Sequence, residues 1–79
     1  GIRFERAATI FQDPSQISIV DEEHSSDEDR WVTLGLDAGG TPLVVVHTFR
    51  ANPNGDVTIR LISARRATQR EAQQYAEFR

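Results

Sequence analysis

The sequence has no cysteine, no lysine and no long apolar run, and these absences exclude several classes of protein and site. Without cysteine, neither a disulfide framework nor a thiolate metal site can form. No apolar run approaches the roughly 20 residues of a membrane-spanning helix, and no signal peptide is present, so we expect a cytoplasmic protein with no membrane association. His24 and His47 lie far apart in the sequence, and the acidic segment around His24 lacks the glycine of a calcium loop. We therefore predict no metal and no other cofactor.

The absence of lysine makes all nine basic residues arginine. Arginine favours planar, bidentate recognition of phosphate or carboxylate groups. The net charge of −3 disfavours nucleic acid as a partner, but the charges are unevenly spread. Eight acids lie between Asp13 and Asp37 against one arginine, whereas six arginines face three acids from Arg50 to the C-terminus. The C-terminal part is therefore where we expect an anion to bind.

The length and the apolar pattern predict one small domain that begins with a helix. Seventy-nine residues of which 38% are apolar allow a single core, so we assign residues 1–79 to one domain. Apolar side chains at helical spacing predict a short amphipathic helix over residues 3–12. Asp13 and Pro14 follow it, and proline discourages continuation of the helix.

The rest of the chain alternates in the manner of strands and closes with a second helix. Thr68 followed three residues on by Glu71 is a capping box, so the last helix should open at Thr68. This order predicts an α+β fold, an antiparallel sheet of about four strands with a helix at each end of the chain and both helices on one sheet face. The predicted strands cover residues 16–20, 30–37, 42–50 and 57–63, with an exposed acidic loop over 21–29.

The glycine pair Gly39-Gly40 predicts the register of the central hairpin. A two-residue loop at this pair would bring apolar residues of the two strands opposite one another. Those residues would form one strongly apolar face, in which His47 is interpreted as a satisfied core or rim histidine. The expected pairs are Leu36 with Leu43, Leu34 with Val45 and Val32 with His47.

Four arginines surround the junction between the last strand and the last helix: Arg60, Arg65, Arg66 and Arg70. A helix start offers free backbone N–H groups and a partial positive charge, so this junction can gather cations around an anion such as phosphate. We expect Arg60, Arg65 and Arg70 to be the phosphate ligands, with Arg66 a lesser candidate. The alternative is that these arginines are solvated or pair with the acids of the chain.

Tyr75 and His24 are candidate proton-transfer residues. Tyr75 is the only phenol, and it could act as a proton donor or as a platform on which a base stacks. The alternative for Tyr75 is core packing with its hydroxyl at the rim. His24 lies in the acidic segment, where neighbouring carboxylates favour its charged form, so it is a candidate general acid or base. The alternative for His24 is a solvated loop residue.

Several stretches together resemble a known family, and the resemblance extends from Phe4 to Glu77. The stretches are FERAATIF at 4–11, Asp13-Pro14, Asp21 to His24, RWVTLG at 30–35, ISARRAT at 62–68 and Arg70-Glu71. With them the chain resembles the BrnT toxins of bacterial type II toxin–antitoxin systems. Members of that family usually carry a further strand and helix ahead of the position of Gly1, and we expect both to be missing here.

The resemblance implies a RelE-like fold, in truncated form, and a metal-independent ribonuclease that acts on RNA. It also implies a ribbon-helix-helix antitoxin of the BrnA kind as partner. On this basis the catalytic candidates are Arg60, Arg65, Arg70, Tyr75 and His24, and the further RNA-binding candidates are Arg50 and Arg66.

The missing strand and helix would leave an unprotected sheet edge and an uncovered apolar patch. Both invite pairing with another chain, so we expect a homodimer built over that gap. The alternative function is a non-catalytic, truncated relative that serves as a dimerising or protein-binding module.

Overall fold

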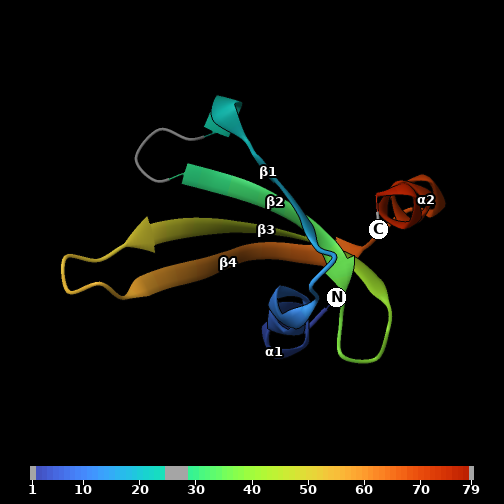
Figure 1. Cartoon of the computed structure of the whole chain (residues 1–79), viewed down its shortest axis with the longest axis horizontal. Coiled ribbons are helices and arrows are strands. Elements are labelled where there is room, and N and C mark those ends of the chain that lie inside the picture. The colour runs from blue at the N-terminus through green and yellow to red at the C-terminus, as the bar shows by residue number, and fades with distance from the viewer. Residues whose placement is uncertain (1, 25–28, 79) are drawn as a thin grey trace.

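The structure, a computed structural model, describes residues 2–24 and 29–78. Its centre is one antiparallel sheet in the order β1-β2-β3-β4, and a helix lies at each end of the chain (Figure 1). The predicted α+β fold with four strands and two terminal helices is therefore confirmed. The strands are β1 Ile17–Val20, β2 Asp29–Leu36, β3 Pro42–Ala51 and β4 Val57–Arg66.

The two terminal helical segments form where the sequence predicts them, whereas residues 22–24, in the segment predicted as a loop, form a short 3₁₀ helix. The first helical segment starts as the α-helix α1 and continues as the 3₁₀ helix η1, and the backbone turns extended at Asp13. The capping box of the last helix is confirmed: the Thr68 hydroxyl accepts from the Glu71 N–H at 3.1 Å, and the Glu71 carboxylate accepts from the Thr68 N–H at 2.8 Å. The helices are α1 Phe4–Ala7, η1 Ala8–Gln12, η2 Glu22–His24 and α2 Gln69–Glu77.

The predicted register of the central hairpin was wrong by one residue. The last pair of the β2–β3 ladder is Leu36 with Pro42, and Leu34 lies opposite Val44. The loop is longer than two residues because the Asp37 carboxylate accepts the N–H groups of Gly39 and Thr41, at 2.8 and 2.9 Å. A shift by one residue moves every side chain of a strand to the other face relative to its partner.

The corrected register gives two faces of different character. Directly opposed residues of antiparallel strands share a face, so Thr33, Gly35, Leu43, Val45 and His47 lie on one side, which we call the core face. Leu34, Val44, Thr48, Arg60 and Arg65 lie on the other side, which we call the arginine face.

The core is built where the N-terminal helices pack on the core face. Ala7 and Ile10 meet Leu43 and Val45 there, and all four side chains are fully buried. Gly35 faces the same packing: a Cβ at that position would stand 3.3 Å from the Cβ of Gln16 and 3.4 Å from that of Ile10, so a side chain there would require Gln16 to move by a few tenths of an ångström.

The C-terminal helix α2 lies on the other side of the sheet. Gln74 and Phe78 of α2 border a hollow of about 270 Å³ together with Leu34 and Val44, which are residues of the arginine face. The expectation that both helices cover one face was therefore wrong. With apolar residues on both faces, each terminal helix packs on a different one.

Candidate functional site

Three arginines gather on the arginine face near the β3–β4 turn. Arg30, Thr48 and Arg60 are direct neighbours in a row across β2, β3 and β4. Arg50 lies two residues beyond Thr48 on the same face. We call Arg30, Arg50 and Arg60 the distal group. Arg30 was not among the predicted site residues, because its place beside Arg60 follows only from the register of two hairpins.

A strand irregularity places arginines of both ends of β4 on the same face. Arg60 and Arg65 are five residues apart, so a regular strand would direct them to opposite sides. The pairing shifts at Val46 and His47, which lie opposite Ser63 and Leu61. This β-bulge adds one unpaired residue to β4, and as a result Arg65 lies on the same face of the sheet as Arg60.

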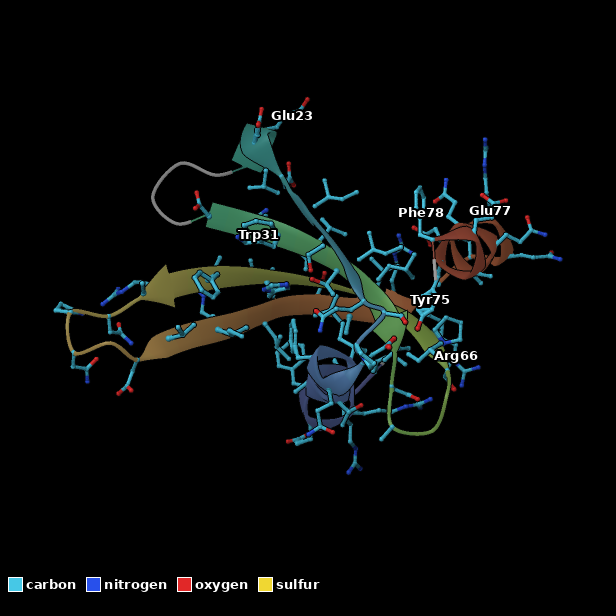
Figure 2. All side chains as sticks on the ribbon, in the orientation of Figure 1. Glu23, Trp31, Arg66, Tyr75, Glu77 and Phe78 are labelled. Atoms are coloured by element: carbon cyan, nitrogen blue, oxygen red, sulfur yellow. The ribbon has the colours of Figure 1, made fainter. Side chains whose placement is uncertain are left out.

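The junction group consists of Arg65, Arg66 and Arg70, where β4 meets α2. The Arg65 guanidinium makes two hydrogen bonds to the Glu71 carboxylate, at 2.8 and 3.0 Å, and its Nη1 also donates to the Arg66 carbonyl at 3.3 Å. Arg66 and Arg70 are exposed, and neither makes an ion pair with any residue that the structure describes. Figure 2 shows Arg66 at the end of the sheet from which α2 extends.

The ion pair fixes the charge of both partners. The Arg65 guanidinium, with help from the Thr68 backbone, lowers the pKa of Glu71 to about 2, and Glu71 raises the pKa of Arg65. Glu71 is therefore ionised near neutral pH and has no proton to donate.

The two groups lie at different positions along the sheet. Thr48 and Val44, the β3 partners of Arg60 and Arg65, are four residues apart, which corresponds to roughly 13 Å along a strand. The structure thus brings Arg65, Arg66 and Arg70 to one end of the sheet and sets Arg60 and Arg50 toward the other.

Tyr75 is part of the packing between the chain ends. Its side chain is 4% exposed, and its hydroxyl donates to the Asp13 carboxylate at 2.6 Å. The same Asp13 oxygen accepts the Leu36 N–H at 2.9 Å. Asp13 therefore ties α2, the turn after η1 and the end of β2 together. Sequence reasoning interpreted Asp13 only as the end of a helix, since no local signal relates residues 62 positions apart.

The two histidines have different surroundings. His24 ends η2, and its side chain lies outside the described part of the structure. His47 is buried, as predicted for a core histidine: its Nε2 lies 2.7 Å from the Thr33 hydroxyl, which lies 2.7 Å from that of Ser18. Burial lowers the pKa of His47, so the ring is neutral near pH 7.

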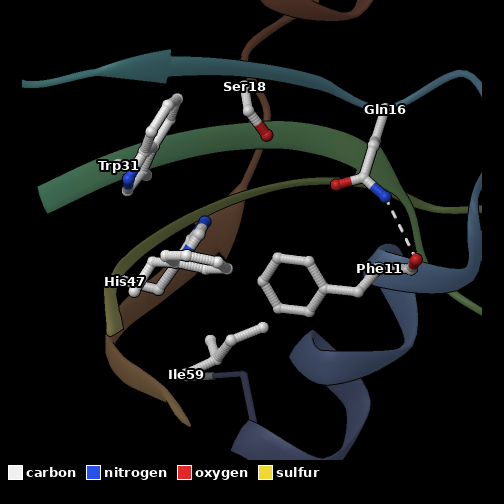
Figure 3. Close-up of a pocket in the computed structure, with 7 residues that line it drawn as sticks. Phe11, Gln16, Ser18, Trp31, His47 and Ile59 are labelled. Atoms are coloured by element: carbon white, nitrogen blue, oxygen red, sulfur yellow. Dashed lines mark hydrogen bonds between the residues drawn. The ribbon is translucent and has the colours of Figure 1, made fainter. Parts of the chain in front are cut away.

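A second hollow, of about 370 Å³, opens on the core face and was not predicted (Figure 3). It lies between η1 and the part of the sheet nearest the β3–β4 turn. Its lining is almost entirely apolar and rich in aromatic rings. The lining residues are Phe11, Gln16, Ser18, Trp31, His47, Phe49 and Ile59.

The described residues contain neither a metal-binding cluster nor a membrane-spanning helix. No three histidine, aspartate or glutamate side chains among them lie close enough together to hold a metal ion. Within that same part of the chain, every helix is too short or too polar to cross a membrane.

The comparison with protein families gives a match over most of the chain. Residues 1–71 match the family described as ribonuclease toxin, BrnT, of type II toxin-antitoxin system. The matched range contains all four strands and both arginine groups. None of the curated proteins compared with the chain matches it.

Proposed function

This chain belongs to the BrnT ribonuclease toxins of type II toxin–antitoxin systems, and we propose that it cleaves RNA without a metal ion, using the arginines of one sheet face. The family implies an RNA substrate and an antitoxin partner. The observation that carries the proposal is the row of Arg30, Thr48 and Arg60 on the same face as Arg65.

The proposed reaction is an internal phosphoryl transfer. The 2′-oxygen of a ribose attacks the adjacent phosphorus and loses its proton to a base, while the 5′-oxygen leaves and gains a proton. Negative charge builds on the phosphoryl oxygens in the transition state, and fixed guanidinium groups stabilise it. No step in this scheme needs an oxidant, a reductant or a further group.

In this proposal the two arginine groups have different roles, one in catalysis and one in RNA binding. The distal group stabilises the reacting phosphoryl group, with Arg60 central. We assign the reaction to this group because the segment that contains His24 is hydrogen-bonded to Arg30. His24 belongs to η2, which follows Asp21, and the Asp21 N–H donates to the Arg30 carbonyl. An imidazole transfers protons near neutral pH, whereas the junction group offers only ionised Glu71 and buried Tyr75.

The junction group then binds the RNA strand farther along. Arg65 is held in place by Glu71, which reduces the entropy lost when the guanidinium binds a phosphate. Arg66 and Arg70 stand exposed beside it and supply further phosphate contacts. Arg50 extends the distal group in the same way.

The remaining parts of the proposal follow from the family. We propose a ribbon-helix-helix antitoxin of the BrnA kind, a RelE-like fold and a cytoplasmic location. We also expect a homodimer. In the described sheet β4 is an edge strand with three arginines, so pairing two β4 edges would bring like charges together. The exposed apolar side chain of Phe78 is a better contact for a second copy.

A second candidate function is a non-catalytic, protein-binding or dimerising relative of the family. Two observations favour it: Arg65 is satisfied by Glu71, and the Tyr75 hydroxyl is buried against Asp13. In that case both side chains hold the fold together and do no chemistry.

Expression without the antitoxin, followed by RNA cleavage in vitro with excess chelator, separates these candidates. We expect growth arrest and chelator-resistant cleavage by the wild-type chain. Arg60→Ala should lower the cleavage rate roughly 100-fold or more, the usual effect of removing one charge-stabilising donor. A folded wild-type chain that leaves RNA intact would refute the nuclease proposal and support the binding module.

The role of Arg65 is tested by a matched pair of variants. Arg65→Ala and Glu71→Gln both break the ion pair, but only the first removes the guanidinium. We expect Arg65→Ala to weaken RNA binding and Glu71→Gln to retain it. If both variants lose RNA binding to the same extent, Arg65 acts through the fold and is not a phosphate ligand.

A further inference from the structure

The apolar hollow on the core face has no part in the proposed cleavage, yet it is built as a binding site. It lies on the opposite side of the sheet from Arg60 and Arg65. Its volume of about 370 Å³ is within the range of pockets that bury organic groups, about 300–1,000 Å³.

The walls of the hollow are fixed in place. The Phe11 ring packs edge-on against the His47 ring, with centroids 4.9 Å apart and an angle of 86°. His47 is held by the Thr33 hydroxyl. Gln16 donates from Nε2 to the carbonyls of Phe11 and Asp13, at 3.1 and 3.2 Å, as Figure 3 shows for the first. A pocket that exists before its ligand arrives loses little entropy on binding.

The hollow also contains polar atoms that the described residues leave without partners. The Nδ1 of His47 and the Nε1 of Trp31 are buried and make no hydrogen bond within the described part of the chain. His47 as a whole is only 5% exposed. Both residues thus line the hollow with the apolar parts of their rings and keep these nitrogens out of contact with solvent.

The rim of the hollow is apolar and its surroundings are acidic. Phe49 and Ile59 are 42% and 43% exposed at the rim. Asp29 lies directly opposite Phe49, and Glu22 and Glu23 follow β1, whose Val20 lies opposite Trp31. Acidic side chains at these positions favour a basic partner over RNA phosphates.

We propose that this hollow is the docking site of the antitoxin, which inserts a bulky apolar side chain from a segment flanked by lysine or arginine. An apolar anchor in a prebuilt pocket, surrounded by complementary charge, is the arrangement of a binding hot spot. The inference rests on the antitoxin partnership of the family and not on the role of the arginines in cleavage. Docking here uses one side of the sheet and RNA the other.

Titration calorimetry of the purified chain with its cognate antitoxin tests this site. Ile59→Asp should weaken binding roughly 30-fold, the effect of losing one hot-spot residue. The control is Ile19→Asp, which makes the same kind of change at a residue that is 66% exposed on the arginine face. We expect Ile19→Asp to bind within twofold of wild type.

Two more variants keep the test decisive. Phe49→Ser changes the rim without adding charge, and circular dichroism shows whether each variant is folded. The triple variant Glu22→Gln, Glu23→Gln and Asp29→Asn should bind more weakly and lose part of the salt dependence of the wild-type affinity. Unchanged binding by folded Ile59→Asp and Phe49→Ser, or an equal loss with Ile19→Asp, overturns the proposal.

A non-cleavable 2′-O-methyl RNA distinguishes the two possible occupants. If Ile59→Asp loses RNA binding and keeps antitoxin binding, the hollow belongs to RNA and the proposal fails. If the wild-type chain leaves RNA intact but the antitoxin variants behave as expected, the docking site stands while the nuclease proposal falls.

Discussion

The two faces of the sheet differ sharply in chemistry although the same strands supply both. On the core face, Leu43 and Val45 are fully buried beneath Ile10 and the N-terminal helices. On the arginine face, the neighbouring strand β4 presents Arg60 and Arg65 to solvent. The difference shows how one short sheet keeps a buried face and a charged face apart, because alternation along each strand directs successive residues to opposite faces.

The separation depends on a feature that alternation alone would not produce. The irregularity opposite Val46 and His47 allows β4 to keep Leu61 and Ala64 on the core face and Arg60 and Arg65 on the other. A regular ladder would have turned one of those arginines toward the N-terminal helices. The bulge is thus what makes the arginine face continuous from the β3–β4 turn to α2.

The largest expected difference between the faces is in stability. Leu43→Ala removes a fully buried side chain from the core face, and we expect a loss of about 2–5 kcal/mol. A chain of this length has a total unfolding free energy of roughly 4–12 kcal/mol, so much of the protein would be unfolded. Ile19→Ala, on the exposed arginine face, should cost no more than about 0.5 kcal/mol. Urea unfolding measures both, and equal losses would contradict the division of the faces.

The secondary structure was largely predictable because its signals are local. The capping box of Thr68 and Glu71, the helix stop at Asp13 and the alternating strands all act over a few residues. The hairpin register was not, because the loop length follows from hydrogen bonds that the Asp37 side chain makes within the turn.

The candidate site was predicted in its residues but not in its arrangement. Arg60 and Arg65 were identified from the sequence, whereas their separation and the entry of Arg30 depend on strand pairing. Glu71 was recognised as a cap, and its second role as the partner of Arg65 appears only when α2 is placed against β4. Each missed feature joins segments whose relative position no local pattern fixes.

A smaller expected effect tests whether Tyr75 is a packing residue or a proton donor. Tyr75→Phe removes one hydrogen bond to the Asp13 carboxylate and leaves the ring in place. We expect stability to fall by about 1–3 kcal/mol, while the cleavage rate per folded molecule stays at the wild-type value. Thermal unfolding and single-turnover cleavage, measured on the same preparation, separate the two quantities. A variant that is as stable as wild type but inactive would make Tyr75 a proton donor.

The smallest expected effect concerns the ion pair between Arg65 and Glu71 on the arginine face. The pKa of Glu71 is about 2 in the folded chain, against an ordinary value of 4.5. A carboxyl group whose pKa falls on folding binds fewer protons when folded, so its contribution is complete above about pH 4.5 and is lost as the pH falls toward 2. Because Arg65 is about half exposed, solvent screens the pair, and together with the cap we expect about 1 kcal/mol.

Glu71→Gln isolates this contribution from that of other carboxyl groups. Asp37 also has a lowered pKa, caused first by the Thr41 N–H and then by Arg6, so the wild-type stability alone mixes several titrations. The difference in unfolding free energy between wild type and Glu71→Gln should be largest near neutral pH and shrink as the pH falls from 4.5 toward 2. A difference that stays constant over that interval would show that the Arg65–Glu71 pair does not stabilise the fold, and would leave the guanidinium available for phosphate alone.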